Sequence, residues 1–173
     1  MQLDRVEISG FRGIRRLSLT FDELTTLIGE NTWGKSSLLD ALAIVLPSNT
    51  ELYQFTMQDF HVDYAISLPQ TQHLQIVLTF SANDPSEPRT GRYRKLKPVW
   101  QTNEDGQQRI IYRISASRND YNISTRYHFL DHSGNELPLH HSELLVKELM
   151  SLHPVLRLKD SRRFVRPING NND

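Results

Sequence analysis

The chain has 173 residues, and its 20 lysines and arginines balance 20 aspartates and glutamates, so the net charge at pH 7 is zero. This balance excludes a globally basic nucleic-acid-binding protein and leaves any contact with a polyanion to a local patch. The absence of cysteine excludes disulfides and thiolate metal sites. No apolar run approaches the ~20 residues of a membrane span, and no apolar signal core begins the chain. We therefore expect one cytoplasmic domain without a membrane segment.

The N-terminal part of the chain is predicted to contain three strands and one helix. Alternating apolar residues predict strands over 3–8 and 17–21, and an apolar stretch predicts a third strand over 24–28. Residues 36–46 predict a helix, and 38–46 are apolar almost all round, which is typical of a helix covered on most sides. Pro47 ends this helix.

The middle of the chain is typical of antiparallel strands. Clean alternation predicts a strand over 74–80, and the prolines and glycine of 81–91 predict an exposed loop. Asn103-Glu104-Asp105-Gly106 has the composition of a hairpin turn. Three further strands, which would form an antiparallel meander, are predicted over 99–102, 109–115 and 121–130.

The C-terminal part is predicted to add one helix and one strand. Residues 142–152 carry leucines on one face, which predicts an amphipathic helix that Ser142 could cap. Residues 155–158 predict a short strand, and 169–173 form a polar tail. Strands and helices in this order predict a mixed α/β fold.

Residues 29–36 read Gly-Glu-Asn-Thr-Trp-Gly-Lys-Ser, which is the phosphate-binding P-loop pattern G-x-x-x-x-G-K-S. A predicted strand before the motif and a predicted helix after it are the context in which a P-loop occurs. Gly29 and Gly34 let the backbone approach phosphate oxygens closely. The loop amides and the positive end of the helix dipole favour anions. The alternative is an ordinary glycine-containing turn before a helix.

Side chains at the end of the motif predict that a nucleotide binds together with Mg²⁺. Lys35 should reach the β- and γ-phosphates as a point charge, and the Ser36 hydroxyl should bind Mg²⁺. Ser37 is a further donor to a phosphate oxygen. The motif therefore predicts a nucleoside triphosphate site.

A P-loop nucleotide hydrolase also needs a second acidic residue, after an apolar strand, that holds Mg²⁺ and polarises water. The apolar run before Asp131 is too short, and two basic residues interrupt the run before Asp160. The chain also lacks an L-S-G-G-type signature and the Asn-Lys-x-Asp motif that reads guanine. The sequence therefore predicts half of a nucleotide site, completed by sequence beyond the chain or by a partner chain.

Two segments together resemble a known family. Phe11-Arg12-Gly13, followed over 29–42 by Gly-Glu-Asn-x-x-Gly-Lys-Ser-Ser-Leu-Leu-Asp-Ala-Leu, resembles the OLD (overcoming lysogenization defect) family of ATP-dependent endonucleases. Residues 154–162 and the middle strands look like the YbjD-type bacterial branch of that family. RecF-type and SMC-type DNA-repair ATPases share the same elements more loosely.

The resemblance implies an ABC-type ATPase followed by a TOPRIM nuclease that cuts DNA with divalent metals. This chain would be the incomplete N-terminal lobe, a P-loop core with an attached antiparallel β-meander. ATP would bridge two heads in a homodimer of the full-length protein, and this segment alone would bind nucleotide without efficient turnover. The implied lobe spans 1–168, with a P-loop core over 1–48, a β-rich subdomain over 72–135, a helix and strand over 141–160, and a polar tail over 169–173.

The resemblance also assigns residues to an ATP and Mg²⁺ site. Arg12 falls where related ATPases contact the nucleotide, and Lys35 is the catalytic residue of the loop. No glutamine occurs over 158–162, and the glutamines within 70–75 come too early, so the loop that senses the γ-phosphate stays unassigned. The implied nucleotide-binding residues are Gly29, Asn31, Gly34, Lys35, Ser36, Ser37 and Arg12, with Mg²⁺ on the Ser36 hydroxyl.

Two runs of basic residues leave their role open. The first could contact a DNA backbone, or it could be an exposed loop and strand edge whose charges discourage aggregation. The second could face DNA, the rest of the ATPase or acidic residues of a partner. Arg15 and Arg16 could contact nucleotide or be solvated at a strand start. The first run is Arg89, Arg92, Arg94, Lys95 and Lys97, and the second is Arg157, Lys159, Arg162, Arg163 and Arg166.

Three other functions share the P-loop. A RecF-type or SMC-type head would lack the nuclease, and a small-molecule kinase would need an arginine-rich lid that the meander does not clearly offer. A naturally short regulator would bind nucleotide or a partner head. The seven histidines are scattered, and adjacent residues such as His140 and His141 do not converge on one metal, so we expect no histidine metal site.

Overall fold

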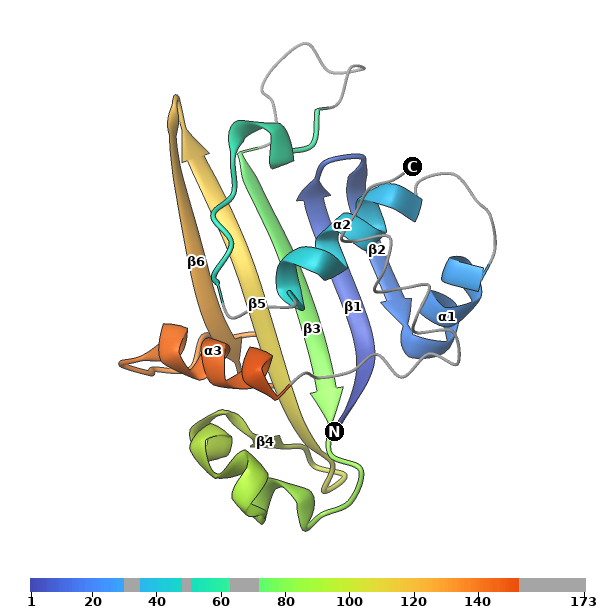
Figure 1. The fold of residues 1–173 in the computed structure, drawn as a ribbon, viewed down its shortest axis with the longest axis vertical. Helices are drawn as coiled ribbons and strands as arrows, with labels where there is room; N and C mark the ends of the chain where they lie inside the picture. The colour runs from blue at the N-terminus through green and yellow to red at the C-terminus, as the bar shows by residue number, and fades with distance from the viewer. Residues whose placement is uncertain (30–34, 48–50, 63–71, 153–173) are drawn as a thin grey trace.

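The computed structural model describes residues 1–29, 35–47, 51–62 and 72–152, which form a six-stranded antiparallel sheet with helices against one face (Figure 1). The strand order is β2-β1-β3-β5, and both β4 and β6 pair with β5. The strands are β1 (Gln2–Phe11), β2 (Ile14–Thr20), β3 (His73–Ser81), β4 (Gln101–Thr102), β5 (Gln108–Asn119) and β6 (Asn122–Leu130). The helices are α1 (Phe21–Gly29), α2 (Lys35–Val45) and α3 (Ser142–Ser151), with the 3₁₀ helices η1 (Met57–Asp59), η2 (Glu87–Arg89) and η3 (Gly91–Val99).

The register of the sheet separates an apolar inner face from a mainly polar outer face, because side chains alternate along each strand. On the inner face, apolar residues of neighbouring strands align in rows and are buried. One inner row is Ile8, Ile76, Ile114 and Tyr127, the next is Val6, Leu78, Tyr112 and Phe129, and the outer row between them is Glu7, Val77, Arg113 and His128.

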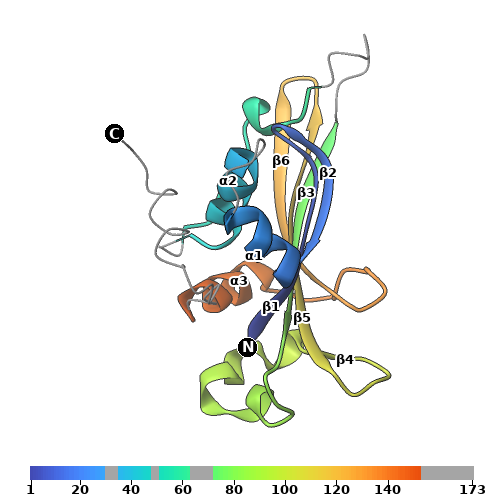
Figure 2. The same ribbon diagram turned by 90° about the vertical axis from the view of Figure 1, so that its right-hand side faces the viewer.

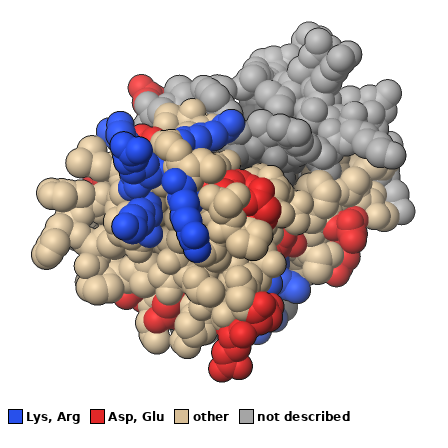
Figure 3. All heavy atoms as spheres, turned by 90° about the horizontal axis from the view of Figure 1, so that it is seen from below, with Lys and Arg blue, Asp and Glu red and all other residues tan. Residues whose placement is uncertain are grey.

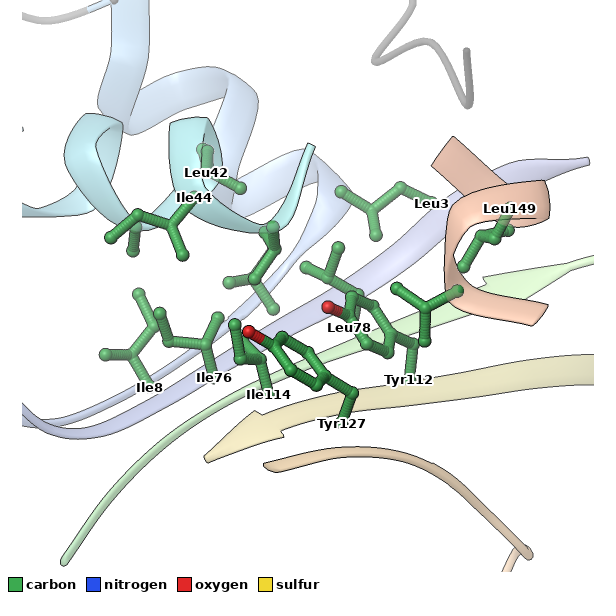
Figure 4. Packing of buried hydrophobic residues seen from close by; sticks show 14 of the residues in the cluster. Leu3, Ile8, Leu42, Ile44, Ile76, Leu78, Tyr112, Ile114, Tyr127 and Leu149 are labelled. Atoms are coloured by element: carbon green, nitrogen blue, oxygen red, sulfur yellow. The ribbon is translucent and has the colours of Figure 1, made fainter. Parts of the chain in front are cut away.

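The three α-helices cover the inner face of the sheet. Figure 2 shows α1, α2 and α3 on the same side of the sheet. In the core, Leu42 and Ile44 of α2 lie over Ile76, and Leu149 of α3 lies near Tyr112 (Figure 4). The predicted all-apolar helix is therefore confirmed as α2, and its apolar surface is buried against the sheet and its neighbours.

Residues 24–28 form part of helix α1, so the predicted third strand is wrong. Leu24 is fully buried, and the side chains of Phe21 and Ile28, three residues before it and four after, pack against the same core. This spacing is that of one helix face. The Thr20 hydroxyl accepts a hydrogen bond from the Glu23 N–H at 3.3 Å, and two acidic residues in the first turn favour the helix dipole. In this structure a helix therefore precedes the P-loop motif.

The predicted meander belongs to the same sheet as the N-terminal strands. β1 pairs with β3, and β3 pairs with β5, so strands from 1–48 and from 72–135 are continuous rather than parts of separate layers. The hairpin turn at 103–106 is confirmed, because Gly106 has a φ of 79° and its N–H donates to the Asn103 carbonyl at 2.9 Å. The predicted strands over 3–8, 17–21, 74–80, 109–115 and 121–130 are confirmed as β1, β2, β3, β5 and β6.

The first basic run lies in η3, except for Arg89 at the end of η2, where the sequence predicted a loop and a strand edge. Tyr93, Leu96 and Val99 are buried at intervals of three residues, which matches the three residues per turn of a 3₁₀ helix. Val99 therefore belongs to this helix, and the strand predicted over 99–102 shortens to β4.

The predicted amphipathic helix over 142–152 is confirmed as α3, but Ser142 does not cap it. His141 precedes the helix as its N-cap residue, and the Ser142 hydroxyl instead donates to the Tyr127 carbonyl at 3.1 Å. Ser142 therefore ties α3 to β6. The strand predicted over 155–158 lies outside the described residues.

In the described part of the chain, each helix is too short, or too polar, to cross a membrane.

Two of the buried core tyrosines, Tyr112 and Tyr127, have hydroxyl groups in different settings. The Tyr127 hydroxyl donates to the Tyr53 carbonyl and accepts from the Gln54 side chain at 3.0 Å. The Tyr112 hydroxyl has no hydrogen-bond partner among the described residues. Burial raises the pKa of both tyrosines, that of Tyr127 to about 12, so both remain protonated at neutral pH.

Tyr112→Phe is expected to raise the free energy of unfolding by about 1 kcal/mol, because it removes a buried polar group that makes no bond. Tyr127→Phe is expected to lower it by about the same amount, because it breaks two hydrogen bonds. Urea denaturation of the two variants beside the wild-type chain measures both changes. Equal losses in the two variants would show that the Tyr112 hydroxyl is bonded.

Candidate functional site

The turn between β1 and β2 lies against the first turn of α2. The Gly13 N–H donates to the Ser37 hydroxyl at 3.3 Å, and a side chain at position 13 would begin 3.0 Å from that hydroxyl. Glycine permits this close approach without displacement of Ser37. The Phe-Arg-Gly element therefore lies next to the start of the helix whose first residue is Lys35.

The backbone of Arg12 is held in a conformation that side chains rarely adopt. Its φ is 46°, in the left-handed region, which costs about 1–3 kcal/mol. The Arg12 N–H donates to the Asp59 carbonyl at 2.7 Å, and the Arg12 carbonyl lies 2.6 Å from Nδ1 of His61. The His61 N–H donates to the Gly10 carbonyl at 2.9 Å. Residues 59–61 therefore hold the strained turn from the side.

Two carboxylates contact the Arg12 guanidinium. Nε donates to Asp59 Oδ1 at 3.0 Å, and Nη1 donates to Asp40 Oδ2 at 2.6 Å. The Asp59 side chain is 1% exposed and also accepts from the Tyr53 hydroxyl and the Thr56 N–H, each at 2.9 Å. The Asp40 side chain, on α2, is 47% exposed. Arg12 thus bridges a buried carboxylate and a largely solvated one.

These contacts determine the charge states of the groups around Arg12. Burial alone would lower the pKa of Arg12, but the hydrogen bond and charge of Asp59, followed by the charge of Asp40, raise it above its usual value. Burial raises the pKa of Tyr53, and its hydrogen bond to Asp59 raises it further. At neutral pH Arg12 is therefore a cation and Tyr53 a hydroxyl donor.

Of the P-loop motif, the structure describes Gly29, Lys35 and Ser36. Gly29 ends α1, and no described heavy atom lies within 4 Å of where a side chain there would begin. Ser36 is exposed in the first turn of α2, and Ser37 faces Gly13. Lys35 is the first residue of α2. The predicted site residues Asn31 and Gly34 lie outside the described residues.

The residues at the start of α2 fit an anionic ligand better than they define a metal centre. A helix N-terminus, an exposed hydroxyl at Ser36 and the cation of Arg12 are groups that attract phosphate oxygens. For Mg²⁺, Ser36 offers one oxygen ligand. Among the described residues, no group of three or more His, Asp or Glu side chains could hold a metal ion.

Asp131, one of the two acids considered for the second acidic motif, closes a turn. Its carboxylate accepts from the N–H of Asn135 at 2.9 Å and from that of Ser133 at 2.8 Å. The backbone hydrogen bonds from Asn135 and Ser133 lower the pKa of Asp131. Its carboxylate is thus occupied by the turn after β6. Asp160 lies outside the described residues.

Sequence reasoning found Arg12, but it missed Asp59, Tyr53 and His61. These three residues lie in a segment without hydrophobic periodicity, and their contacts with the β1–β2 turn are long-range. The one local signal is a polar pattern, Thr56 followed three residues later by Asp59, which is typical of a capped turn. This pattern indicates a local turn, but it does not identify Arg12 as the partner of Asp59.

The first basic run gathers on one end of the molecule. Four of its members, Arg92, Arg94, Lys95 and Lys97, flank the buried edge of η3. Figure 3 shows lysine and arginine side chains together on the surface seen from below. Arg92 donates to the Leu152 carbonyl at 3.0 Å, and Lys95 lies 3.9 Å from Glu148, both contacts with the region of α3. The helix η3 has two exposed edges. Arg92 and Lys95 lie on one edge, and Arg94 and Lys97 lie on the other.

The aromatic residues of this region do not form a stacking platform for bases. Tyr93 is buried, and its ring meets that of Trp100 edge to face, with centroids 5.8 Å apart. Arg15 and Arg16 lie elsewhere, exposed on the edge strand β2. The second basic run, over 157–166, lies outside the described residues.

Comparisons with known proteins identify the family and the fold of this chain. A family model described as "Protein of unknown function (DUF2813)" matches residues 1–172. The "Uncharacterized protein YbjD" of Escherichia coli (strain K12) is 43% identical over 171 residues, which cover 98% of this chain and 31% of that protein. The chain therefore spans less than half of the curated relative, and the match agrees with the YbjD-type resemblance.

A solved chain from "Structural biochemistry of ATP-driven dimerization and DNA stimulated activation of SMC ATPases" matches with a TM-score of 0.50. The match covers 90% of this chain and 81% of that chain at 14% identity, so it concerns the fold alone. The mixed α/β fold with its antiparallel sheet is similar to that of an SMC ATPase. From the family model, which spans nearly its whole length, the chain belongs to the DUF2813 family.

Proposed function

We propose that this chain is the nucleotide-binding N-terminal lobe of an ATPase and that it binds ATP with Mg²⁺. One observation carries the proposal: the P-loop motif leads directly into α2, and the Arg12 turn contacts the first turn of that helix. The similarity in fold to an SMC ATPase supports the same reading. Neither a kinase lid nor a second catalytic acid is needed for this binding role.

Each residue of the proposed site has a chemical task. Lys35 would hold the β- and γ-phosphates, and Ser36 would give its hydroxyl to Mg²⁺. Gly29, Asn31 and Gly34 would let backbone amides surround the phosphates, with Ser37 as a further donor. Arg12, oriented by Asp59, would add a cation beside them. Bound Mg²⁺ would neutralise part of the phosphate charge.

The full-length protein would complete the site. Because the chain spans 31% of its curated relative, we propose that later sequence supplies the second acidic motif, the signature motif and a TOPRIM nuclease of OLD type. ATP would then join two heads of a homodimer acting on DNA. The SMC-like fold equally favours a RecF-type or SMC-type head without a nuclease. Sequence downstream of residue 173 separates the two, because long heptads indicate the SMC type and a TOPRIM carboxylate pattern indicates the OLD type.

We further propose that η3 contacts the phosphate backbone of DNA. From Arg89 to Lys97 there are five basic residues and no acidic residue, in a chain whose net charge is zero. Residues on one edge of a 3₁₀ helix repeat every ~6 Å, so two cations per edge can reach neighbouring phosphates. With Tyr93 and Trp100 packed inward, the contact would be electrostatic and independent of base sequence.

Lys35→Ala is expected to abolish the binding of Mg·ATP to this chain, because it removes the cation that faces the β- and γ-phosphates. Isothermal titration calorimetry on folded protein measures this binding. Lys147→Ala, which removes an exposed lysine from α3, serves as the matched control and should bind like wild type. Unchanged binding in Lys35→Ala would contradict the proposed site.

Arg94→Glu/Lys97→Glu is expected to weaken binding to a short DNA duplex and to flatten its salt dependence. Each phosphate neutralised contributes about 0.9 to the slope of log K against log salt, so the slope should fall by about 2. Fluorescence anisotropy, repeated at several salt concentrations from roughly 50 to 200 mM, measures the affinity and its slope. Arg126→Glu/Lys147→Glu makes the same charge change on other surfaces. Equal effects of the two double variants would contradict a role specific to η3.

A further inference from the structure

The two carboxylates that contact Arg12 hold it with different strength. Asp59 is buried and has three described donors, namely Arg12, Tyr53 and Thr56. Removal of a donor there leaves a buried charge uncompensated, which is strongly unfavourable. Asp40 is 47% exposed, and water can replace Arg12 as its partner at little cost. The Asp59 contact is therefore the fixed one, and the Asp40 contact is the exchangeable one.

The exchangeable contact lies on the same face of α2 as Ser36 and Ser37 of the proposed phosphate site, which precede Asp40 by four and three residues. Asp40 lies on α2, five residues after Lys35, and the Gly13–Ser37 contact places the Arg12 turn at the start of the same helix. The Arg12 side chain is 35% exposed, so its outer nitrogens are accessible to an incoming anion. Asp40 would compete with such an anion for the guanidinium, and its negative charge would also repel the anion.

We propose that Asp40 is a resident counter-ion that a nucleotide phosphate displaces from Arg12, while Asp59 is a positioning residue that keeps the guanidinium in place during the exchange. This inference rests on the proposed ATP-binding function. The exchange is between two anions, a carboxylate and a phosphate, on one cation. The strained backbone of Arg12, held by Asp59 and His61, keeps the side chain from following Asp40 when the contact opens.

The two carboxylates then have opposite effects on binding. Asp40→Asn should tighten Mg·ATP binding about threefold, because it weakens the competitor and removes a repelling charge. Asp59→Asn should weaken binding about tenfold, because its single amide oxygen stays with the donors Tyr53 and Thr56, and the NH2 group then faces Arg12 and releases it. Glu104→Gln, in the β4–β5 turn at the far end of the sheet, removes a negative charge as a control and should leave binding unchanged.

The decisive comparison includes Arg12. In an Arg12→Ala background, Asp40→Asn should give a clearly smaller gain, because only the repelling charge is removed and there is no guanidinium to release. Equilibrium titration of the whole chain with a fluorescent ATP analogue, with excess Mg²⁺ and at fixed salt, measures all dissociation constants. Thermal unfolding checks that each variant is folded. If Asp59→Asn unfolds, the pair Asp40→Asn and Arg12→Ala/Asp40→Asn decides alone.

Three results would overturn the proposal. Weaker binding in Asp40→Asn would mean that Arg12 and Asp40 form a rigid link required by the site. A gain of the same size with and without Arg12 would mean a general charge effect. Wild-type protein that binds no better than Lys35→Ala would remove the proposed function and this inference together, whereas the first two results leave the proposed function intact.

Discussion

The contact between Arg12 and the buried carboxylate of Asp59 is the constraint on which the candidate site depends. It joins three parts of the chain that are distant in sequence: the β1–β2 turn, the segment over 51–62 and, through Asp40, helix α2. A buried carboxylate must have donors, so the surrounding segment is fixed wherever those donors are. The end of the sheet and the segment over 51–62 therefore keep one relative position, and the guanidinium that they hold reaches α2 at Asp40.

Fold, family and motif each support a different part of the functional conclusion. The similarity to an SMC ATPase concerns the fold, in which an antiparallel sheet and α2 occur together. The DUF2813 family model matches nearly the whole chain. The P-loop motif alone points to phosphate chemistry, since neither comparison identifies a ligand of this chain. Although the net charge of the chain is zero, basic residues are concentrated on η3.

Much of the sheet could be predicted from the sequence, because alternation of apolar residues is a local signal and five of its strands have it. Residues 24–28 alone do not distinguish a strand from a helix. Phe21 completes the apolar face of α1, and Thr20 caps its first turn. The 3₁₀ helix η3 was missed because a period of three is seldom sustained over nine residues. In the candidate site, motif spacing found Lys35 and Arg12, whereas Asp59 depends on a partner 47 residues away that no local pattern reveals.

The position of β1 has a consequence for how the protein is made. β1 is synthesised before the other strands of this sheet, yet it lies inside the sheet between β2 and β3, and β3 begins only at His73. Until then one edge of β1 has no strand to pair with, and the hairpin of β1 and β2 alone is marginally stable. Chain growth past the middle of the sequence is thus a precondition for a complete core, and the nascent N-terminal hairpin is the part that most needs protection from aggregation.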